Sequence, residues 1–324
     1  MIKNNIHNTM KTTGTIRRPG AIGIMMIVLA LMLGHIVPAQ AQYDVAYTQY
    51  MFNEFFVNPA YTGSKDALNI SGLTRQQWLG IDGAPRTYGL FAHTPLANDK
   101  IGLGIGMSHE TIGTNQVSIG YLNFAYRIRL SRGILALGLK GSVGYYDPRY
   151  YEIVNVVPDP WLNGAESGVA FNFGFGAYYY TNNFYLGFSI PRMLNSVYIT
   201  GQNERFDISD WTYYLQGGYV YDVNPDFSIM PSAMLKLTSG ASPQLNVSLM
   251  GLAWNTLWLG ADYRTDNSLA AIVGVQISKS LRVMYSYGFD LDNTYNQWLG
   301  GTHEISISYT FDYWNKRVVS PRLF

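Results

Sequence analysis

Apolar residues alternate with small residues along much of this chain, and that two-residue period restricts the fold more than any other feature. In "KIGLGIGMSH", Ile101, Leu103 and Ile105 alternate with glycine. The same period recurs in "ILALGLKGSVGY", "VAFNFGFGAY", "LRVMYSYGF" and "HEISISYTF". Successive side chains of a β-strand point to opposite faces. The pattern therefore predicts strands with one apolar face and one face of small residues.

Extended to the whole chain, this pattern predicts about fourteen strands in a single domain. No compact repeat and no break in the pattern separates a second domain. The predicted strands begin near Ala67, Thr87, Lys100, Val117, Ile134, Val169, Phe184, Trp211, Phe227, Leu245, Leu257, Leu269, Leu281 and Thr302.

Strand number decides which face points inward. About eight closed strands already enclose as much space as side chains can fill, so fourteen would leave a wide lumen. The apolar face should then point outward to lipid, with the small residues lining the lumen. A Lys or Arg on the lipid face would cost about 2–4 kcal/mol at mid-bilayer. The mid-strand charges all fall on the small-residue face: Arg127, Lys140, Lys236, Asp262, Arg264, Arg282 and Glu304.

The connections alternate between short and long. Short ones such as "LSRG", "TNN" and "WNT" alternate with long segments at 146–167, 192–210 and 290–301. Short periplasmic turns and long outer loops are typical of outer-membrane barrels, which predicts both ends of the mature chain on the periplasmic side. A secreted β-sandwich would explain the alternation, but neither the placement of charges nor the unequal loops.

The amino-terminal residues have the organisation of an export signal. A basic stretch without acids precedes an apolar run at 21–37, and Ala39-Gln40-Ala41 fits a cleavage site. An uncleaved membrane anchor is the alternative. We expect a signal peptide at 1–41, a plug or docking segment at 42–66, a barrel at 67–311 and a periplasmic tail at 312–324.

Composition agrees with an exported barrel and excludes several classes of protein. The chain has no cysteine, so it has no disulfide framework and no thiol chemistry. Removal of 1–41 leaves 18 basic and 21 acidic residues, a net charge of −3, which is no footprint for nucleic acid. Charged residues make up 13 %, against roughly 25 % in soluble domains.

Little in the sequence indicates catalysis. Ser108 and His109 are adjacent on a predicted strand, so they point to opposite faces and cannot form a nucleophile and its base. Asp262 and Arg264 share a face and read best as a structural ion pair. The loop 290–297 lacks the glycine and terminal Glu of a calcium loop. We predict no catalytic residue, no cofactor and no metal. The mostly positive lumen leaves three readings open: anion passage, an acidic plug, or internal side-chain pairs.

The stretch "YTQYMFNEFFVNPAYTG" (47–63) is aromatic and does not alternate. Helical spacing relates four of its residues, Tyr47, Tyr50, Met51 and Phe55. Asp44 is a candidate N-cap, and Pro59 should stop a helix before it. We expect a helix of about three turns on the periplasmic side, with its aromatics against the barrel mouth. A plug and a partner-docking surface are both open as its role.

Three groups of residues match the sequence motifs of one known protein family. The first is "QYMFNEFFVNPAYTGS" (49–64), the second "RQQWLGIDGAPRTY" (75–88) and the third the ending "GTHEISISYTF" (301–311). His109-Glu110 with Ile112-Gly113, and Pro231, Ser232, Leu235 and Lys236, also match. Together these residues make the chain resemble the PorP/SprF family, which often has Pro where this chain has Glu54.

The resemblance implies an outer-membrane barrel of the type IX secretion system of Bacteroidetes. It implies a role in secreting or attaching large cell-surface proteins, including gliding adhesins in some members. Implied partners are secreted cargo with a C-terminal sorting domain, the periplasmic secretion ring and a peptidoglycan-binding lipoprotein, besides outer-membrane lipid. A diffusion pore or small-ligand transporter with an N-terminal plug is the alternative, and a hydrolase is disfavoured.

Two sets of aromatic and polar residues are candidates for partner contacts. The hypothetical docking residues on the periplasmic side are Gln49, Tyr50, Met51, Asn53, Phe55, Asn58, Pro59 and Tyr61. The hypothetical cargo contacts on the outer loops are Trp78, Tyr150, Tyr151, Trp161 and Trp298.

Overall fold

The chain folds into one antiparallel sheet that closes on itself. The computed structural model describes residues 47–96, 99–149, 167–194, 211–239, 241–291 and 300–311. The strands are β1 (Asn69–Gln76), β2 (Arg86–Leu96), β3 (Ile101–Ile112), β4 (Asn115–Leu130), β5 (Gly133–Asp147), β6 (Gly168–Tyr180), β7 (Phe184–Ile190), β8 (Thr212–Tyr219), β9 (Tyr221–Asn224), β10 (Phe227–Thr238), β11 (Gln244–Ala253), β12 (Leu257–Arg264), β13 (Ser268–Gln276), β14 (Leu281–Asp290) and β15 (Thr302–Thr310).

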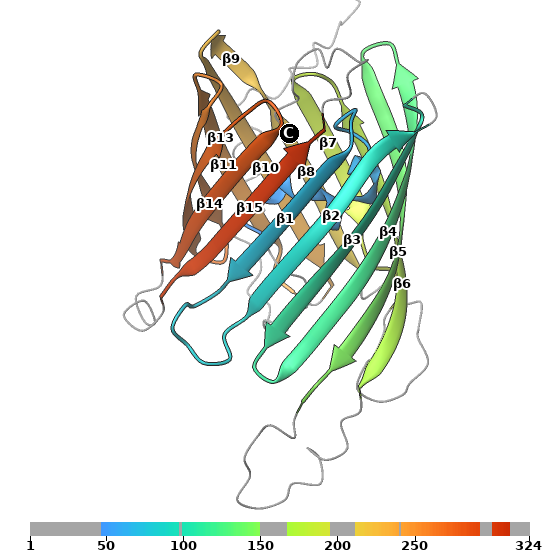
Figure 1. Cartoon of the computed structure of the whole chain (residues 1–324), viewed down its shortest axis with the longest axis vertical. Helices are drawn as coiled ribbons and strands as arrows, with labels where there is room; N and C mark the ends of the chain where they lie inside the picture. Colours follow the sequence, from blue (N-terminus) through green and yellow to red (C-terminus); the bar gives the residue numbers. More distant parts are fainter. Residues whose placement is uncertain are drawn as a thin grey trace, which may run out of the picture.

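Apart from β8 and β9, which do not pair with each other, each strand pairs with its neighbours in sequence, and the first strand pairs with the last. β1 pairs with both β2 and β15, and β10 pairs with β8, β9 and β11. β8 and β9 are separated only by Val220 and occupy one position in the barrel. The result is a tilted barrel of fourteen positions (Figure 1). This confirms the predicted fold class, and every predicted strand start lies within two residues of the observed one.

The two ends of the barrel differ in their connections. β2–β3, β4–β5, β6–β7, β9–β10, β11–β12 and β13–β14 are joined by a few residues each, at what we call the short-turn end. The opposite, long-loop end carries the connections from Asp147 to Gly168, from Ile190 to Thr212 and from Asp290 to Thr302. The chain leaves β15 at the short-turn end, which is uppermost in Figure 1.

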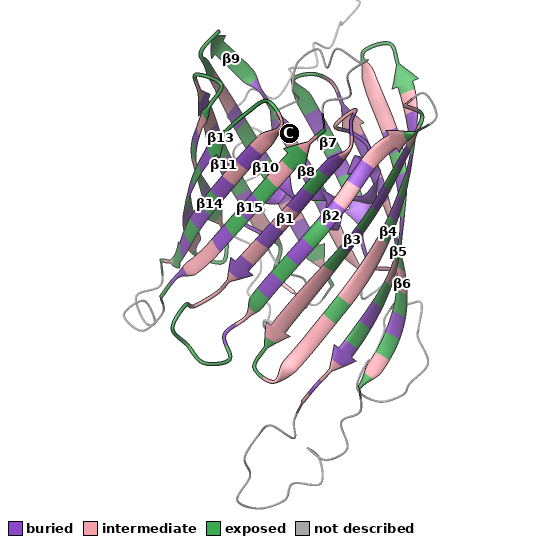
Figure 2. Cartoon of the chain, in the orientation of Figure 1, coloured by how far each residue is buried: buried purple, intermediate pink, exposed green. Residues whose placement is uncertain are grey.

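Exposure alternates along the strands, and the exposed face is apolar. Ile105 is 65 % exposed, Leu122 63 % and Phe171 62 %, whereas their sequence neighbours on the other face are buried or partly buried. Figure 2 shows this as alternating bands along the strands. An outward apolar surface of this kind suits lipid tails. In the part of the chain that the structure describes, no helix has the length and apolar character needed to cross a bilayer.

The first described segment lies inside the barrel as three short 3-10 helices. They are η1 (Tyr50–Phe52), η2 (Glu54–Phe56) and η3 (Pro59–Tyr61), drawn in blue within the barrel in Figure 1. The segment 47–64, which we call the plug, touches β4, β5 and β6 on one side and β14 and β15 on the other. It therefore fills the lumen.

The sequence predicted one helix of about three turns at the periplasmic mouth of the barrel. The segment instead forms three short 3-10 helices, and it lies inside the lumen. The expected cap, Asp44, lies outside the described residues. The Asn53 side chain donates to the carbonyl of Gln49 (3.1 Å), the acceptor that an α-helix would offer to the backbone N–H of Asn53. That N–H instead bonds the Tyr50 carbonyl (3.1 Å), which closes a 3-10 turn.

Arginine substitutions on the outward face of β5 test where the middle of the bilayer lies along the barrel. Leu139 lies at the middle of β5 and is 59 % exposed. The substitution Leu139→Arg should lower the free energy of unfolding by about 2–4 kcal/mol, because it places a charge at mid-bilayer. Tyr145→Arg, near the long-loop end of the same strand, is the matched control and should cost about 0–1 kcal/mol. Guanidinium unfolding of the barrel refolded in lipid vesicles measures both. Equal losses would contradict a bilayer centred on Leu139.

Candidate functional site

The filled lumen is the most elaborate feature of the molecule. All plug residues from Tyr47 to Ser64 are buried, and Gln49, Met51, Phe55, Asn58 and Ala60 have no measurable exposure. The eight hypothetical docking residues lie within this set, so none of their side chains reaches a surface in this state. A docking role would require the plug to leave the lumen, and it stays a prediction.

A carboxylate on the last strand holds the start of the plug. The backbone N–H groups of Thr48 and Gln49 each donate to one carboxylate oxygen of Glu304 (3.0 Å both). The Gln49 side chain donates to the Glu304 carbonyl (3.2 Å) and accepts from Ser306 (2.5 Å). Arg75 of β1 lies 3.7 Å from the same carboxylate. Charge-assisted bonds to backbone N–H groups are among the stronger hydrogen bonds in proteins.

Other barrel side chains bind carbonyls that the plug's 3-10 turns leave open. Asn123 donates to the Phe55 carbonyl (3.2 Å) and Lys140 to the Phe56 carbonyl (2.5 Å). Asn58 donates to the carbonyl of Ala177 in β6 (3.1 Å), while its side-chain oxygen caps η3 at the N–H of Ala60 (3.0 Å). Buried backbone groups without partners are costly, so these contacts are what allow irregular backbone inside the barrel.

Aromatic rings fill the space around the plug. Phe55 stacks on Phe91 of β2 with ring centroids 4.7 Å apart, and Phe56 meets Phe91 edge-on at 5.2 Å. Phe52 packs edge-on against Trp258 (5.4 Å), and the Arg282 guanidinium lies 4.1 Å from the Phe52 ring centroid. Ring pairs and cations over rings each add to the stabilisation from burial alone.

Glycines on the inner face make room for the plug backbone. A Cβ on Gly138 would lie 2.2 Å from the backbone nitrogen of Ala60, and one on Gly102 would lie 2.0 Å from the Thr62 carbonyl oxygen. The sequence predicted that the small residues line a wide lumen. At these positions the small residues instead permit close contact with protein.

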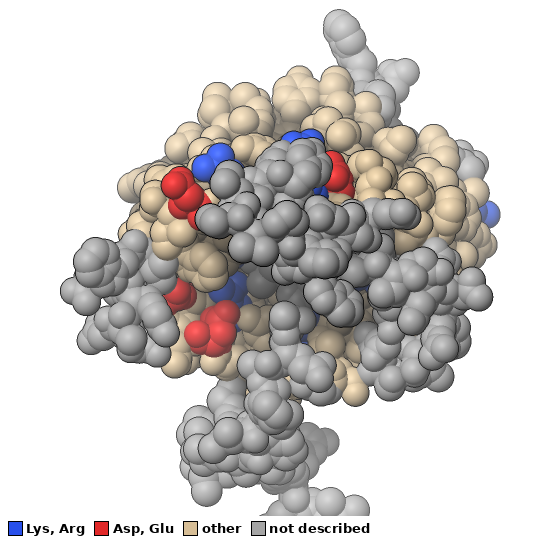
Figure 3. Space-filling model, turned by 90° about the horizontal axis from the view of Figure 1, so that it is seen from below, with Lys and Arg blue, Asp and Glu red and all other residues tan. Residues whose placement is uncertain are grey.

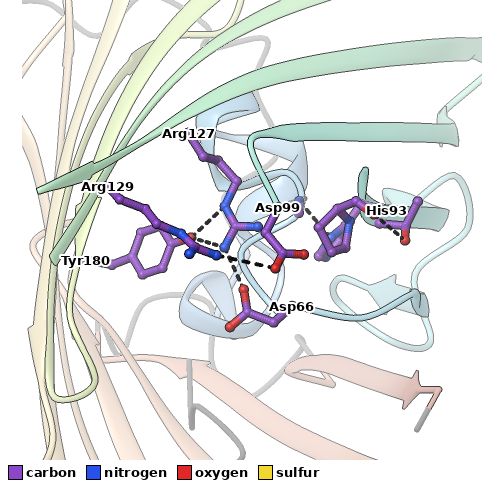
Figure 4. A network of polar contacts seen from close by, with 9 residues as sticks. Asp66, His93, Asp99, Arg127, Arg129 and Tyr180 are labelled. Atoms are coloured by element: carbon purple, nitrogen blue, oxygen red, sulfur yellow. Dashed lines mark hydrogen bonds and ion pairs between the residues drawn. The ribbon is translucent and has the colours of Figure 1, made fainter. Parts of the chain in front are cut away.

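A polar network fixes the plug's exit at the short-turn end (Figure 4). Arg127 binds Asp66 (2.6 Å) and donates from two nitrogens to the Tyr180 hydroxyl (2.9 and 2.6 Å). The N–H of Gly63 donates to Nδ1 of His93 (3.0 Å). Beyond Asp66 the chain enters β1, so this network determines where the plug ends and the wall begins.

Glu54 is a buried carboxyl at the centre of the plug. Gln216 of β8 donates to it (3.0 Å). The Glu54 side chain has no measurable exposure, so a charge on it would carry the full cost of desolvation.

The structure places the seven sequence-predicted lumen charges on the inner face and gives them separate surroundings. Arg127, Lys140 and Glu304 contact the plug or its exit, as described above. Asp262 accepts a short hydrogen bond from Ser248, and Arg264 pairs with Asp266 (2.7 Å). Lys236 lies 6.0 Å from the Tyr214 ring centroid, and Arg282 lies over Phe52.

Among the described residues, two further side chains of charged residue types, an arginine and a glutamate, are buried in the lumen, where the sequence analysis did not predict them. Arg75 is 5 % exposed and shares the inward face of β1 with Asn69 and Ser71, so strand parity could have found it. Glu54 carries no comparable signal, because the plug is not a strand.

Of the five hypothetical cargo-contact residues, only Trp78 is among the described residues. It is half-buried in the β1–β2 connection, with a positive φ of 47°. The backbone of this connection is tied to its neighbours: Leu79 N–H donates to Gly301 (3.2 Å) and Gly113 N–H to Gly83 (2.8 Å). Tyr150, Tyr151, Trp161 and Trp298 lie outside the described residues.

Ser108 and His109 do not bond each other and point to opposite faces of the sheet. Ser108 bonds the Tyr121 hydroxyl (2.8 Å), whereas His109 bonds Ser118 (2.9 Å) on the other face of the sheet. Among the described residues, no three His, Asp or Glu side chains come together in a way that could hold a metal ion.

A cavity of about 90 Å³ lies between the plug and the long-loop end. Tyr47, Phe56 and Val57 of the plug form part of its lining, and the wall contributes residues near the long-loop ends of their strands, among them Thr87 and Glu110. We call this cavity the vestibule. Figure 3 views the molecule from this end, where acidic and basic side chains are few among the described atoms.

A closed antiparallel barrel with an apolar exterior and a lumen filled by its own chain defines an integral outer-membrane β-barrel protein. The family of type IX secretion system membrane proteins PorP/SprF matches residues 39–309, and the chain belongs to that family. It is therefore an outer-membrane component of the type IX secretion system.

Solved barrels resemble the chain only distantly. The outer membrane protein Omp33 of Acinetobacter baumannii aligns at 8 % identity, over 77 % of this chain and 100 % of its own, with a TM-score of 0.48. A TodX ΔS2S3 mutant, a monoaromatic hydrocarbon channel, aligns at 11 % identity, over 81 % and 94 %, with a TM-score of 0.49. The KdgM porin aligns at 11 % identity, over 75 % and 99 %, with a TM-score of 0.35. These likenesses do not bear on function. No curated protein matches.

The close packing of the plug against the wall predicts that Gly138 is needed for the plug to fit in the lumen. Gly138→Ala should displace η3, because the new methyl group would overlap the backbone of Ala60. The test uses Met51→Cys, whose thiol is buried in the plug and should not react with a maleimide. When Gly138→Ala is added, the displaced plug should expose this thiol, and the maleimide should label it. Gly141→Ala on the same strand meets nothing within 4 Å and is the matched control. Protection of the thiol in both variants would show that the plug tolerates the contact.

Proposed function

We propose that the protein is a non-catalytic docking component for exported proteins, and not a diffusion pore. The filled lumen is the observation that carries this proposal. Buried backbone and side chains occupy it from the level of Glu304 to that of Arg127, and residues on opposite walls bind them. A route for solutes would need the plug to move. Family membership supports the secretion role but does not identify the cargo.

In this proposal the barrel acts through its two rims. The long-loop end would contact a large cell-surface protein carrying a C-terminal sorting domain, with Trp78, Tyr150, Tyr151, Trp161 and Trp298 as candidate contacts. The short-turn end would face the periplasmic secretion ring and the peptidoglycan-binding lipoprotein. The ordered β1–β2 connection supports the first of these roles. It presents exposed Leu79 (49 %) and Ile81 (37 %) on a backbone fixed by hydrogen bonds.

Conductance separates the docking component from the pore with an N-terminal plug. The whole barrel in a planar bilayer should show no steady conductance, because the plug fills its cross-section. A variant lacking residues 47–61 should open to large, steady steps if it still forms a heat-modifiable barrel. A large, steady conductance of the unaltered protein would favour the pore.

Deletion of the gene tests the secretion role directly. At least one large surface protein should be lost from the cell surface or accumulate in the periplasm, as measured by comparing surface and culture proteins with those of the parent strain. Restoring the gene is the control. Normal export and display of every cargo would overturn the proposal.

A further inference from the structure

A group of polar side chains lies on the outward face of the barrel at the long-loop ends of β1, β2 and β3, which are neighbours in the wall (Figure 1). Arg86, the first residue of β2, stands directly opposite Gln76 of β1 and Thr111 of β3. His109 of β3 is a diagonal neighbour of Arg86, because its direct partner on β2 is Tyr88. We call the four side chains of Gln76, Arg86, His109 and Thr111 the rim patch.

Strand parity turns the rim patch toward lipid. Arg86 is exposed on the same face of β2 as Tyr88 (46 %) and Leu90 (51 %), and the intervening residue of the strand is buried. On four other strands the outward residue nearest the long-loop end is instead apolar or aromatic: Val169 of β6, Leu237 of β10, Tyr263 of β12 and Phe289 of β14. The rim patch is therefore a local departure from the surface around it.

The height of Arg86 along the barrel matches the edge of the bilayer core. It lies five residues from Phe91, the middle residue of β2. At about 3.3 Å per residue and a strand tilt of about 35–45°, five residues rise about 12–13 Å along the barrel axis. The outward apolar band of such barrels is about 25 Å tall, so the guanidinium lies level with lipid headgroups. Because long loops are extracellular in these barrels, the headgroups are those of the outer leaflet.

The protein itself leaves much of the hydrogen-bonding capacity of the rim patch unused. In the described part of the chain, the side chains of Gln76, Arg86 and Thr111 have no hydrogen-bond or ion-pair partner. His109 bonds Ser118 through Nδ1 (2.9 Å), and its Nε2 has no partner among the same residues. The outward faces of β1 to β4 carry no acid. A ligand with negative charge and several acceptor oxygens would satisfy all four side chains.

We propose that the rim patch binds the phosphate of a lipid headgroup in the outer leaflet. The planar guanidinium of Arg86 offers paired N–H donors that fit two phosphate oxygens. Directly opposite side chains on a sheet face have Cβ atoms about 4.5–5.5 Å apart, and diagonal ones lie about 7–8 Å apart. Gln76, Thr111 and His109 are therefore close enough to donate to the same phosphate. The apolar outward residues nearer the middle of β2 would contact the acyl chains of that lipid, which a free phosphate lacks.

Native mass spectrometry of the purified barrel in detergent tests the proposal. The probes are lipid A that carries phosphate and the same lipid A after its phosphates are removed. The parent barrel should retain the phosphorylated form at least about tenfold more strongly, because charge-assisted hydrogen bonds are the stronger ones. Arg86→Gln should lose most of this preference. Arg132→Gln replaces an exposed arginine in the β4–β5 turn at the short-turn end, so it is the matched control and should keep the preference.

Two further variants separate phosphate recognition from an effect on folding. Arg86→Lys keeps the positive charge without the planar fork and should retain only part of the preference. Gln76→Leu combined with Thr111→Val removes two neutral donors and should reduce the preference by at least about twofold. Each variant is first checked for a heat-modifiable barrel, and if Arg86→Gln does not form one, the other two variants carry the test.

Equal retention of both forms of lipid A by the parent barrel would contradict the proposal. An unchanged preference in Arg86→Gln would contradict it too, and loss of a surface protein from cells with that variant would then assign the rim patch to a protein partner. Displacement of the lipid by an equal concentration of inorganic phosphate would show a site for a free anion instead. The lipid measurements need no cargo, so they are independent of the proposed docking function.

Discussion

Fourteen strands enclose more space than inward-facing side chains can fill, and the rest of the structure answers that constraint. A barrel of this width holds water, a ligand or protein. Here the chain supplies its own filling from the residues immediately before β1. The plug adds aromatic surface at the centre of the lumen, so the barrel gains a packed interior that its wall alone could not form.

Irregular backbone inside the barrel has N–H and C=O groups that its own turns do not pair. Polar side chains of the wall form hydrogen bonds with several of these groups. Glu304, Asn123 and Lys140 are spread around the barrel and each binds plug backbone. Their value lies in satisfying groups that would otherwise be buried without partners. Among the described residues, Lys140 and Glu304 thus have a structural reason to lie on the inner face, because each holds backbone of the plug.

The wall of this protein could be read from its sequence almost completely, whereas the plug could not. Strand periodicity is a local property, so each start from Thr87 to Thr302 could be located from neighbouring residues alone. The plug's form depends on residues far away in the chain. Tyr47, Tyr50 and Phe55 do have helical spacing, but the Asn53 side chain and the distant wall select 3-10 turns. Likewise, the alternating pattern places Gly102 and Gly138 on the lumen face, but it does not reveal that the plug backbone packs directly against them.

The contact between the start of the chain and its end has a consequence for assembly. Thr48 and Gln49 bind Glu304 across 256 and 255 residues of sequence, and Gln49 binds Ser306 across 257. Contacts of such separation form late and slow folding, because the intervening loop must be closed first. The plug precedes every strand in the sequence, so it is made before them and has no complete binding site until the last strand exists. A chain cut short before β15 would lose barrel closure and the anchor of its plug together, so the fold itself discriminates between finished and unfinished molecules.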